Sequence, residues 1–337
     1  MKIRAMAARE ARGPLAPFEF EPGPLGKEQV EIRVASCGIC HSDLSMRNNE
    51  WGMSAYPLVP GHEIVGTVTA TGAEVRGVRV GDRVGLGWYS HSCLTCRQCL
   101  SGHHNLCGSN EQTIVGRHGG FASRVRANWE WVTHLPDALD AGKAGPLFCG
   151  GITVFNPLVQ FGVRPTDRVG VVGIGGLGHL AVQFLNKWGC EVYAFTSAGA
   201  KAKEALALGA HHTVDSRSDG AIAGLKGALN FILVTANVPL NWGAYIDALA
   251  PAGRLHFVGA VLEPLAIGAF PLISGQKQLS GSPLGSPATT AMMIDFCARH
   301  GIAPVTESFP MSKANEAFAH LESGRARYRV VLQNDLD

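Results

Sequence analysis

A short glycine-rich segment sets the strongest limit on how this chain can fold. Residues 173–178 read Gly-Ile-Gly-Gly-Leu-Gly and directly follow an apolar run at Val169–Val172. Apolar residues then recur at helical spacing; they are Leu177, Leu180, Ala181, Phe184, Leu185 and Trp188. A strand, a G-x-G-x-x-G loop and a helix in this order are typical of a dinucleotide-binding site. The same glycines without the flanking elements would indicate an ordinary loop.

Each glycine of this loop has a predicted task. Gly173 makes the turn, Gly175 lets a pyrophosphate approach the backbone, and Gly178 lets the helix pack against the strand. Gly176 and Leu177 complete the loop. The partial positive charge at the helix N-terminus then faces the phosphates of a dinucleotide.

The strand and helix patterns continue to alternate after this loop. Strand-like runs occur at Glu191–Phe195, Asn230–Val234 and Arg254–Val258, and a helix-like run occurs at Ala200–Leu208. This alternation predicts an α/β fold with a doubly wound parallel sheet and helices on both faces.

The chain before Cys149 has a different texture. Short β patterns at Val30–Ala35, Glu63–Thr69, Asp82–Leu86 and Phe121–Val125 are separated by Gly and Pro, which predicts an antiparallel or mixed β domain. After Leu284 the sequence predicts helices at Ala288–His300 and Lys313–Ser323 and a last strand at Arg329–Gln333.

Length and charge limit the function classes. The chain has 337 residues, and at roughly 150 residues per domain we expect two domains. A net charge of only +2 argues against a nucleic-acid partner. The first residues contain no apolar segment of signal-peptide length, and the longest apolar stretch, Val169–Leu185, is interrupted by glycines, His179 and Gln183. We therefore expect a cytoplasmic protein without a membrane partner.

Four of the nine cysteines are crowded into one segment. Cys93, Cys96, Cys99 and Cys107 form C-x2-C-x2-C-x7-C. Four thiolates on a tight loop match the tetrahedral coordination of zinc, and a closed set of four protein ligands predicts a structural site. The alternative is an iron–sulfur cluster, but Gly108 stands where the ferredoxin pattern has proline.

The end of the second predicted strand bears on the choice of dinucleotide. NAD enzymes usually place Asp or Glu there, whereas this chain has Thr196, Ser197 and Ala198, with Lys201 just beyond. Hydroxyls and a lysine can donate hydrogen bonds and positive charge to a 2′-phosphate. The sequence thus favours NADP(H). If Lys201 is only a solvated helix residue, NAD(H) remains possible.

Several further motifs occur in a recognisable order. They are Gly38-Ile39-Cys40-His41-Ser42-Asp43, Gly61-His62-Glu63, the four-cysteine segment, Cys149-Gly150-Gly151 and the glycine loop. Together they resemble the zinc-dependent medium-chain alcohol dehydrogenases over essentially the whole chain. Cys40–Leu44, Gly52–Pro57 and Arg327-Tyr328-Arg329 are similar to the cinnamyl-alcohol branch and its broad-specificity bacterial aldehyde reductases.

The resemblance implies an architecture and an activity. A partly open, GroES-like β-barrel catalytic domain at 1–149 and 285–337 would hold two zinc ions per subunit. A Rossmann domain at 150–284 would bind the dinucleotide. The implied reaction interconverts small-molecule primary alcohols and aldehydes, aromatic or medium-chain aliphatic, by hydride transfer. A homodimer formed through Leu279–Leu284 is implied, with a tetramer as the alternative.

The resemblance also assigns residue roles. Cys40, His62 and Cys149 match the catalytic zinc ligands, a Cys2His set long associated with alcohol dehydrogenases. Among the catalytic positions, Glu63 matches a carboxylate that approaches the metal, Asp43 an acid that orients the histidine, and Ser42 the hydroxyl that exchanges the alcohol proton. The implied cofactor contacts outside the glycine loop and strand end are His41, Thr153, Val258, Ala260 and Arg329.

Two departures from the family pattern limit this transfer. Ser45 stands where many relatives have a histidine that ends the proton relay, and serine alone is no general base near neutral pH. The segment between Cys107 and Phe121 is shorter than in the plant enzymes.

Trp51 and Trp88 are candidates for an apolar substrate wall, with ordinary packing as the alternative. Two other functions are alternatives. The missing strand-end acid argues against an NAD-linked alcohol or polyol dehydrogenase, and the presence of Cys40, His62 and Cys149 argues against a non-catalytic nucleotide-binding protein on the same fold.

Overall fold

The computed structural model describes residues 2–197 and 199–336, and the chain forms two compact units. Unit 1 spans Met1–Ile152 and Leu284–Asp337, and unit 2 spans Thr153–Pro283. The predicted domain limits at 149/150 and 284/285 lie close to the bounds of these units. That the two units are the catalytic and the dinucleotide-binding domain stays a prediction. Ala198, part of the predicted strand-end segment, lies outside the described residues.

Unit 2 is built on a parallel sheet. In its described residues the strand order is β12-β11-β10-β13-β14-β15, which is 3-2-1-4-5-6 in chain order. Every neighbouring pair is parallel. The strands are β10 (Arg168–Val172), β11 (Glu191–Thr196), β12 (His212–Asp215), β13 (Leu229–Val234), β14 (Leu249–Phe257) and β15 (Gln278–Gly281). The predicted doubly wound sheet is confirmed.

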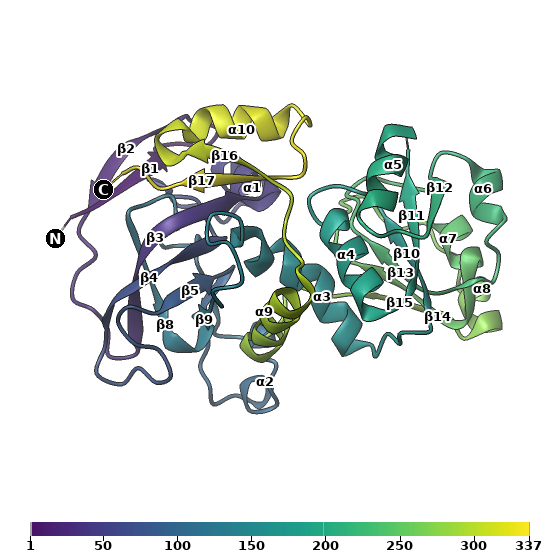
Figure 1. Cartoon of the computed structure of the whole chain (residues 1–337), viewed down its shortest axis with the longest axis horizontal. Coiled ribbons are helices and arrows are strands. Elements are labelled where there is room, and N and C mark those ends of the chain that lie inside the picture. Colours follow the sequence, from purple (N-terminus) through teal and green to yellow (C-terminus); the bar gives the residue numbers. More distant parts are fainter. Residues whose placement is uncertain (1, 198, 337) are drawn as a thin grey trace. The chain divides into compact units, whose positions relative to one another are not determined.

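Helices connect these strands and cover the sheet on both sides (Figure 1). They are α3 (Gly150–Gln160), α4 (Gly178–Trp188), α5 (Gly199–Ala207), α6 (Asp219–Ala223), α7 (Trp242–Ala248) and α8 (Ala269–Gly275), with α3 crossing from unit 1 into unit 2. Helix α4 ends where Gly189 adopts a left-handed φ of 104°. Its apolar stripe, including Leu180, Phe184 and Leu185, is fully buried, as a helix packed on a sheet requires.

Unit 1 is built on a mixed sheet. The described order is β16-β17-β3-β4-β5-β9, and β8 also pairs with β3. All of these pairs are antiparallel except β16 with β17. The strands are β3 (Gln29–Ile39), β4 (Ile64–Thr71), β5 (Arg83–Leu86), β8 (Arg124–Asn128), β9 (Thr133–His134), β16 (Thr306–Pro310) and β17 (Arg329–Gln333).

Smaller elements complete unit 1. Two short antiparallel pairs are β1 (Ile3–Ala8) with β2 (Leu15–Phe20) and β6 (Tyr89–His91) with β7 (Glu111–Gln112). The helices are α1 (His41–Asn48), α2 (Arg97–Leu100), α9 (Pro287–His300) and α10 (Ala314–Glu322), with 3-10 turns η1 (His104–Leu106), η2 (Trp129–Trp131), η3 (Gly145–Phe148) and η4 (Met311–Lys313). One large apolar core, with Ile32, Ile64, Phe121 and Phe318 fully buried, joins the sheet to these elements.

Some predicted bounds need correction. The strand predicted at Phe121–Val125 begins only at Arg124, because Phe121 and Ala122 lie in the loop that packs into the core and only Arg124–Asn128 pair with β3. Strand β14 begins at Leu249 rather than Arg254. Strands β12 and β15 were not predicted.

Candidate functional site

Four side chains from distant parts of unit 1 gather at one buried point. Potential ligand atoms of Cys40, His62, Glu63 and Cys149 all lie within 4.8 Å of one another. Cys40 follows β3 and precedes α1, His62 and Glu63 lie just before β4, and Cys149 follows η3. The sheet brings the first three together, because Cys37, near the end of β3, is paired with Ile64, the first residue of β4.

The spacing of three of these groups fits a tetrahedral metal. The Sγ atoms of Cys149 and Cys40 are 3.9 Å apart, and His62 Nε2 lies 3.3 Å from Cys149 Sγ. Sulfurs bound to one tetrahedral zinc at about 2.3 Å would be about 3.8 Å apart. The two thiols and the imidazole are at least nine-tenths buried, so the donor set is shielded and consists of ligands that zinc prefers.

Asp43 orients the histidine of this cluster. Its Oδ1 lies 3.0 Å from His62 Nδ1 and accepts the Gly61 N–H at 2.8 Å, while Oδ2 accepts the Cys40 N–H at 3.0 Å. Burial is the largest single influence and would lower the pKa of His62, but Asp43 and Cys40 together raise it, and the net shift is upward. The hydrogen bond between Asp43 and Nδ1 leaves Nε2 directed at the thiols.

Glu63 and Arg329 form a buried ion pair beside the cluster. The Arg329 guanidinium contacts one Glu63 oxygen and donates to the Ile39 carbonyl at 3.2 Å. The other Glu63 oxygen, Oε2, is buried without a hydrogen-bond partner. Burial raises the pKa of Glu63, and Arg329 opposes that rise. Arg329 was expected to contact the cofactor phosphates. Here its side chain turns inward, because Glu63 would otherwise be an unpaired buried carboxylate.

The first turn of α1 leads from the cluster towards the surface. The Cys40 thiol lies 3.7 Å from Ser42 Oγ, and Ser42 is half-buried. One turn later, Ser45 Oγ donates to Glu50 Oε2 at 2.6 Å. His41 begins the helix and is exposed. Glu50 has no recognisable signal in the sequence, because it lies beyond the helix end, where spacing gives no indication of contact with Ser45.

Aromatic side chains form one wall of the site. The Trp88 ring lies edge-on to the His62 ring at 5.0 Å, and Trp51 lies edge-on to Trp88 at 6.1 Å. Trp51 is 42% exposed. Trp88 also lines a narrow cavity of about 20 Å³ together with Phe148 and Leu284. An apolar wall is thus present beside the metal cluster.

The second cysteine cluster lies on its own lobe. The Sγ atoms of Cys93, Cys96, Cys99 and Cys107 lie within 4.8 Å of one another, and helix α2 carries Cys99. Backbone N–H groups of Cys96 and Ser109 donate to the sulfurs of Cys93 and Cys107 at 3.3 and 3.4 Å. N–H donation, chiefly from Thr95, lowers the pKa of Cys93 to about 6. Burial raises the pKa of Cys99 in the same lobe to about 12, so without an ion the Cys93 thiol ionises more readily than the Cys99 thiol.

In unit 2 the glycine loop follows β10, beside the point where the strand order reverses. Gly173 has φ of +91°, which favours glycine. A Cβ on Gly178 would lie 1.9 Å from the Gly173 carbonyl oxygen, whereas a Cβ on Gly175 would meet nothing within 4 Å. The loop is thus tight where it meets the helix and open at Gly175, the position predicted to face a pyrophosphate.

The remaining predicted cofactor residues lie at strand ends and on helices of unit 2. Thr196 ends β11 and is buried, Ser197 follows it, and Lys201 lies in α5. Thr153 lies in α3, and Val258 and Ala260 follow β14. Arg217 lies close to the end of β11. It follows β12, whose last residue Asp215 is in register with Thr196, and it contacts Asp215 at 3.2 Å.

Comparison with known proteins places these features in a family. Residues 26–137 match the model of the alcohol dehydrogenase GroES-like domain, and residues 176–299 match that of zinc-binding dehydrogenases. Aldehyde reductase AdhA of Synechocystis sp. is 60% identical over 332 residues, covering 98% of this chain and 99% of that protein. The chain belongs to the zinc-dependent medium-chain dehydrogenase family. Its fold and its cinnamyl-alcohol-dehydrogenase-like character are as predicted.

Solved structures of this family have the same fold. A cinnamyl alcohol dehydrogenase from Sorghum bicolor superposes with a TM-score of 0.94 at 35% identity, covering 100% of this chain and 99% of that one. CAD from Helicobacter pylori complexed with NADP(H) gives a TM-score of 0.90 at 28% identity, covering 99% and 98%. This zinc-dependent dehydrogenase is thus an oxidoreductase of small-molecule alcohols or aldehydes. In the part of the chain that the structure describes, no helix is long and apolar enough to cross a membrane.

Proposed function

We propose that the chain interconverts primary alcohols and aldehydes, aromatic or medium-chain aliphatic, with NADP(H) as the hydride carrier. The observation that carries this proposal is the buried Cys40–His62–Cys149 set beside a half-buried serine. A closed structural site has four protein ligands. Here the two thiols and the imidazole would hold the ion, while Glu63 is engaged by Arg329, so that the ion would supply Lewis acidity to a substrate oxygen.

The two cysteine-containing sites would hold one zinc ion each. Cys40, His62 and Cys149 are the proposed catalytic ligands, with Asp43 holding the imidazole. Cys93, Cys96, Cys99 and Cys107 are the proposed structural ligands. When bound, the catalytic zinc polarises the substrate oxygen and the dinucleotide gives or takes the hydride. Glu63 contributes a buried carboxylate, one oxygen of which is held by Arg329 while Oε2 has no hydrogen-bond partner.

A proton path would run along α1. Ser42 lies against the cluster, and Ser45, three residues later, lies on the same helix face. Ser45 Oγ donates to Glu50, which is exposed and also accepts from Asn48 Nδ2 at 3.0 Å. The Ser45–Glu50 pair thus supplies an ionised acceptor where many relatives have histidine. In alcohol oxidation the proton would leave through Ser42 and reach solvent by this carboxylate.

NADP(H) preference rests on the end of β11. Thr196, Ser197 and Lys201 offer donors and positive charge, and residues 196–203, which end the strand and follow it, contain no Asp or Glu. The H. pylori relative described as complexed with NADP(H) is consistent with this. NAD-linked polyol oxidation is the second candidate, because a protein named probable mannitol dehydrogenase from Fragaria ananassa is 40% identical over 98% of this chain and 95% of its own.

The cofactor and substrate proposals share one test, the kcat/KM for cinnamaldehyde reduction with NADPH and with NADH. We expect NADPH to be preferred, and Lys201→Glu to lower kcat/KM with NADPH roughly 10- to 100-fold, which is the size of one lost charge-assisted hydrogen bond. Lys203→Glu, an exposed position on the same helix, is the matched control. Faster turnover with NADH would overturn the NADP(H) assignment, and turnover of mannitol but not cinnamaldehyde would favour the second candidate.

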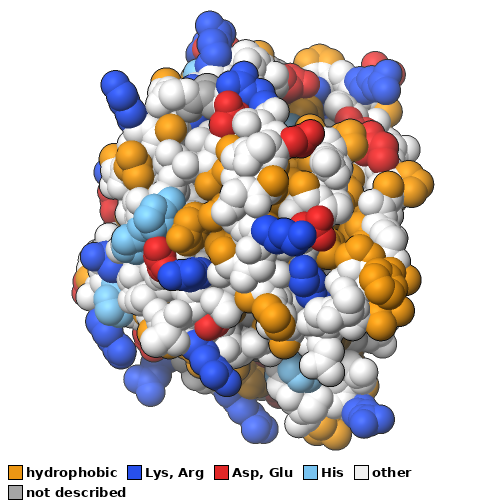
Figure 2. All heavy atoms as spheres, turned by 90° about the vertical axis from the view of Figure 1, so that its right-hand side faces the viewer, with side chains coloured by type: hydrophobic (Ala, Val, Ile, Leu, Met, Phe, Trp, Pro, Cys, Tyr) orange, Lys and Arg blue, Asp and Glu red, His pale blue; other side chains and the backbone are white. Residues whose placement is uncertain are grey.

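We further propose a homodimer formed through residues 279–284. Strand β15 is the edge of the unit 2 sheet, and Leu279 on it is 40% exposed. Figure 2 shows apolar side chains among charged ones on the face of this unit. Light scattering after gel filtration tests the proposal. We expect a dimer for the natural chain and a monomer for Leu279→Lys; a monomeric natural chain would refute it, and a tetramer would add a second interface.

A further inference from the structure

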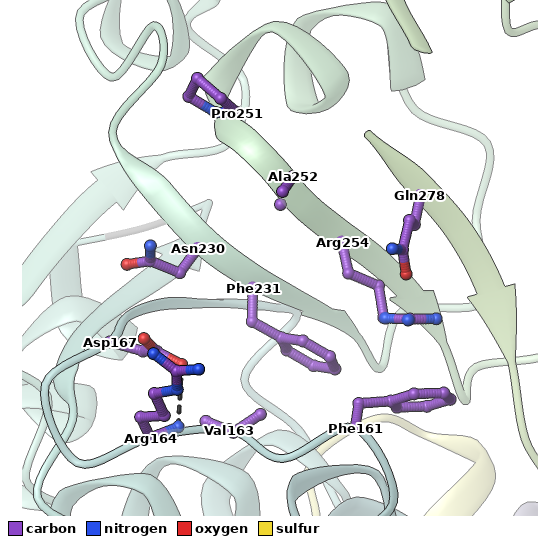
Figure 3. Close-up of a pocket in the computed structure, with 11 residues that line it drawn as sticks. Phe161, Val163, Arg164, Asp167, Asn230, Phe231, Pro251, Ala252, Arg254 and Gln278 are labelled. Atoms are coloured by element: carbon purple, nitrogen blue, oxygen red, sulfur yellow. Dashed lines mark hydrogen bonds between the residues drawn. The ribbon is translucent and has the colours of Figure 1, made fainter. Parts of the chain in front are cut away.

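Unit 2 contains a cavity at the end of the sheet opposite the glycine loop. It measures about 320 Å³ and opens beside the starts of β10, β13 and β15 (Figure 3). Phe231, Arg254 and Gln278 lie side by side across three strands in register. Because the strands are parallel, their starts share one edge, and the loop at Gly173 lies at the other end of β10. The cavity is therefore separate from the predicted dinucleotide site.

Arg254 is a cation without an acidic partner in this cavity. Its guanidinium lies over the Phe161 ring at 4.0 Å, and Nη1 donates to Ser280 Oγ at 3.1 Å. Within the described residues no carboxylate forms an ion pair with it. Since a guanidinium has five N–H donors in a planar fork, several donors stay available to a ligand.

The other polar groups around the cavity are mostly donors. Asn230 Oδ1 accepts the Arg168 N–H at 2.9 Å, which leaves its side-chain NH₂ group free to donate. Arg164 is exposed at the rim, and its backbone N–H donates to Asp167 at 2.8 Å, the dashed bond in Figure 3. Asp167 is the one carboxylate among the described lining residues, against two guanidinium groups.

The neighbouring histidine does not change this charge balance. His256 lies two residues after Arg254 on the same strand and is fully buried between Ser280 and Ser282. Burial, with a contribution from Arg254, lowers the pKa of His256 to about 4. The histidine is therefore neutral at physiological pH, and Arg254 is the charge that faces the cavity.

We propose that this cavity binds a small organic anion through a phosphate or carboxylate group. Arg254 is the main anchor, Arg164 and Asn230 are further donors, and the Phe161 and Phe231 rings contact the apolar part of the ligand. The volume lies at the lower end of the usual range for small-molecule sites, roughly 300–1,000 Å³. This inference does not depend on the proposed function of the chain.

Calorimetric titration of the full-length chain tests the site. Inorganic phosphate and citrate are the two probes, and each is titrated in the presence of saturating NADP⁺ or NAD⁺, whichever a prior titration shows to bind, so that the pyrophosphate-binding loop is already filled. We expect at least one probe to bind. Arg254→Gln should weaken that binding at least about tenfold, because a charge-assisted hydrogen bond is removed. Arg164→Gln should weaken it by a smaller factor.

Controls separate binding from stability. Arg254 also links β14 to β15 through Ser280, so thermal unfolding of each variant must show that it is folded. Arg164 is exposed and carries no such link, so Arg164→Gln still tests the site if Arg254→Gln does not fold. Arg79→Gln makes the same charge change at an exposed position of unit 1 and should bind like the natural chain. No heat with either probe, or equal affinity in all variants, would overturn the proposal.

Discussion

Asp43 holds three groups of the metal cluster in place at once. It receives the backbone N–H groups of Cys40 and Gly61 and the imidazole of His62. We predict that Asp43→Asn lowers zinc affinity at the catalytic site roughly 10- to 100-fold, as changes to such supporting partners of a ligand usually do. Chelator competition with zinc quantification measures this. The four-cysteine lobe should keep its zinc, and unchanged affinity at both sites would contradict the role given to Asp43.

Glu50 is expected to matter for alcohol oxidation. Hydrogen bonds from Ser45, then Asn48, lower the pKa of Glu50, so the carboxylate is ionised throughout the neutral range. The nearby Arg12 guanidinium lowers the pKa of Glu50 further. Glu50→Gln should reduce kcat at pH 7 by roughly 10-fold or more, because a general base contributes at least that much. The loss should shrink as pH rises, since hydroxide can replace the carboxylate.

Two companion variants sharpen the Glu50 test. Ser45→Ala breaks the link to Glu50 and should reproduce the defect, whereas Ser45→His provides its own base and should make activity independent of Glu50. The pH profile of kcat between pH 6 and 10 would be compared for all three. A Glu50→Gln profile that coincides with the natural one would exclude this path.

At the residue scale, the sequence identifies ligand types better than their partners. The resemblance pointed to Cys40, His62 and Cys149, and the structure brings them together. The resemblance also implied that Arg329 contacts the cofactor, whereas in the structure its side chain is buried in an ion pair with Glu63. The contact of Ser45 with Glu50 was not predictable, because it depends on how the chain turns at Asn49, which has a left-handed conformation with φ of 56°.

The loop between β10 and α4 gives a prediction at the scale of elements. A Cβ at position 178 would lie 1.9 Å from the Gly173 carbonyl oxygen, so Gly178→Ala must push the helix away from the loop. We expect a loss of roughly 1–3 kcal/mol in the free energy of unfolding, as is typical for overpacking. Urea unfolding measures it.

Gly175→Ala is the matched control for that substitution. Nothing lies within 4 Å of the added methyl group, so the free energy of unfolding should stay nearly unchanged. If a pyrophosphate approaches the backbone here, the same methyl group should still weaken dinucleotide binding, which fluorescence titration with NADPH would reveal. Equal stability losses in the two variants would contradict the distinction between a packed and an open glycine.

Elements with long apolar runs were predictable, and short polar ones were not. β10 and α4 have continuous buried patterns, and their predicted bounds agree closely with the structure. β12 reads His-Thr-Val-Asp with one buried residue, and β15 is mostly exposed. Both are edge strands fixed by pairing with β11 and β14 rather than by their own sequence. Propensity alone cannot reveal such strands.

On the scale of the whole molecule, acid should weaken unit 2 through His256. Its pKa falls to about 4 when folded, from about 6.5 in an unfolded chain, because the buried neutral ring would have to be charged. Because the pKa of His256 is lower in the folded chain, its contribution to the free energy of unfolding is fully present above pH 6.5 and is lost as the pH falls towards 4. Once His256 is protonated in both the folded and the unfolded chain, the free energy of unfolding has fallen by about 3 kcal/mol.

His256→Gln should flatten this dependence. The variant starts less stable, because it loses the fit between Ser280 and Ser282. Its free energy of unfolding should nevertheless change less between pH 7 and 4 than that of the natural chain. His300→Gln, on α9 in unit 1, is the control and should leave the pH dependence of unit 2 unaltered. Parallel stability curves for His256→Gln and the natural chain would show that another group is responsible.

The strand and helix patterns of the sequence predict the two kinds of sheet. They do not predict that the C-terminal strand joins the sheet of unit 1. The alternating elements predicted the parallel sheet, and the early β patterns predicted a mixed one. Strand β17, however, pairs with β3 across nearly the whole chain. Pairings between such distant segments leave no local mark in the sequence, because they depend on the complete fold.

If each cysteine cluster binds zinc as proposed, the two sites would be completed at different moments of protein synthesis. The lobe of Cys93–Cys107 is local, and a growing chain can capture an ion there soon after Cys107 has left the ribosome. The other set waits for Cys149, and Arg329 reaches Glu63 only when the C-terminal strand has been made. On that proposal, a shortage of zinc during translation would leave the Cys40–His62–Cys149 site empty in chains whose four-cysteine lobe is already filled.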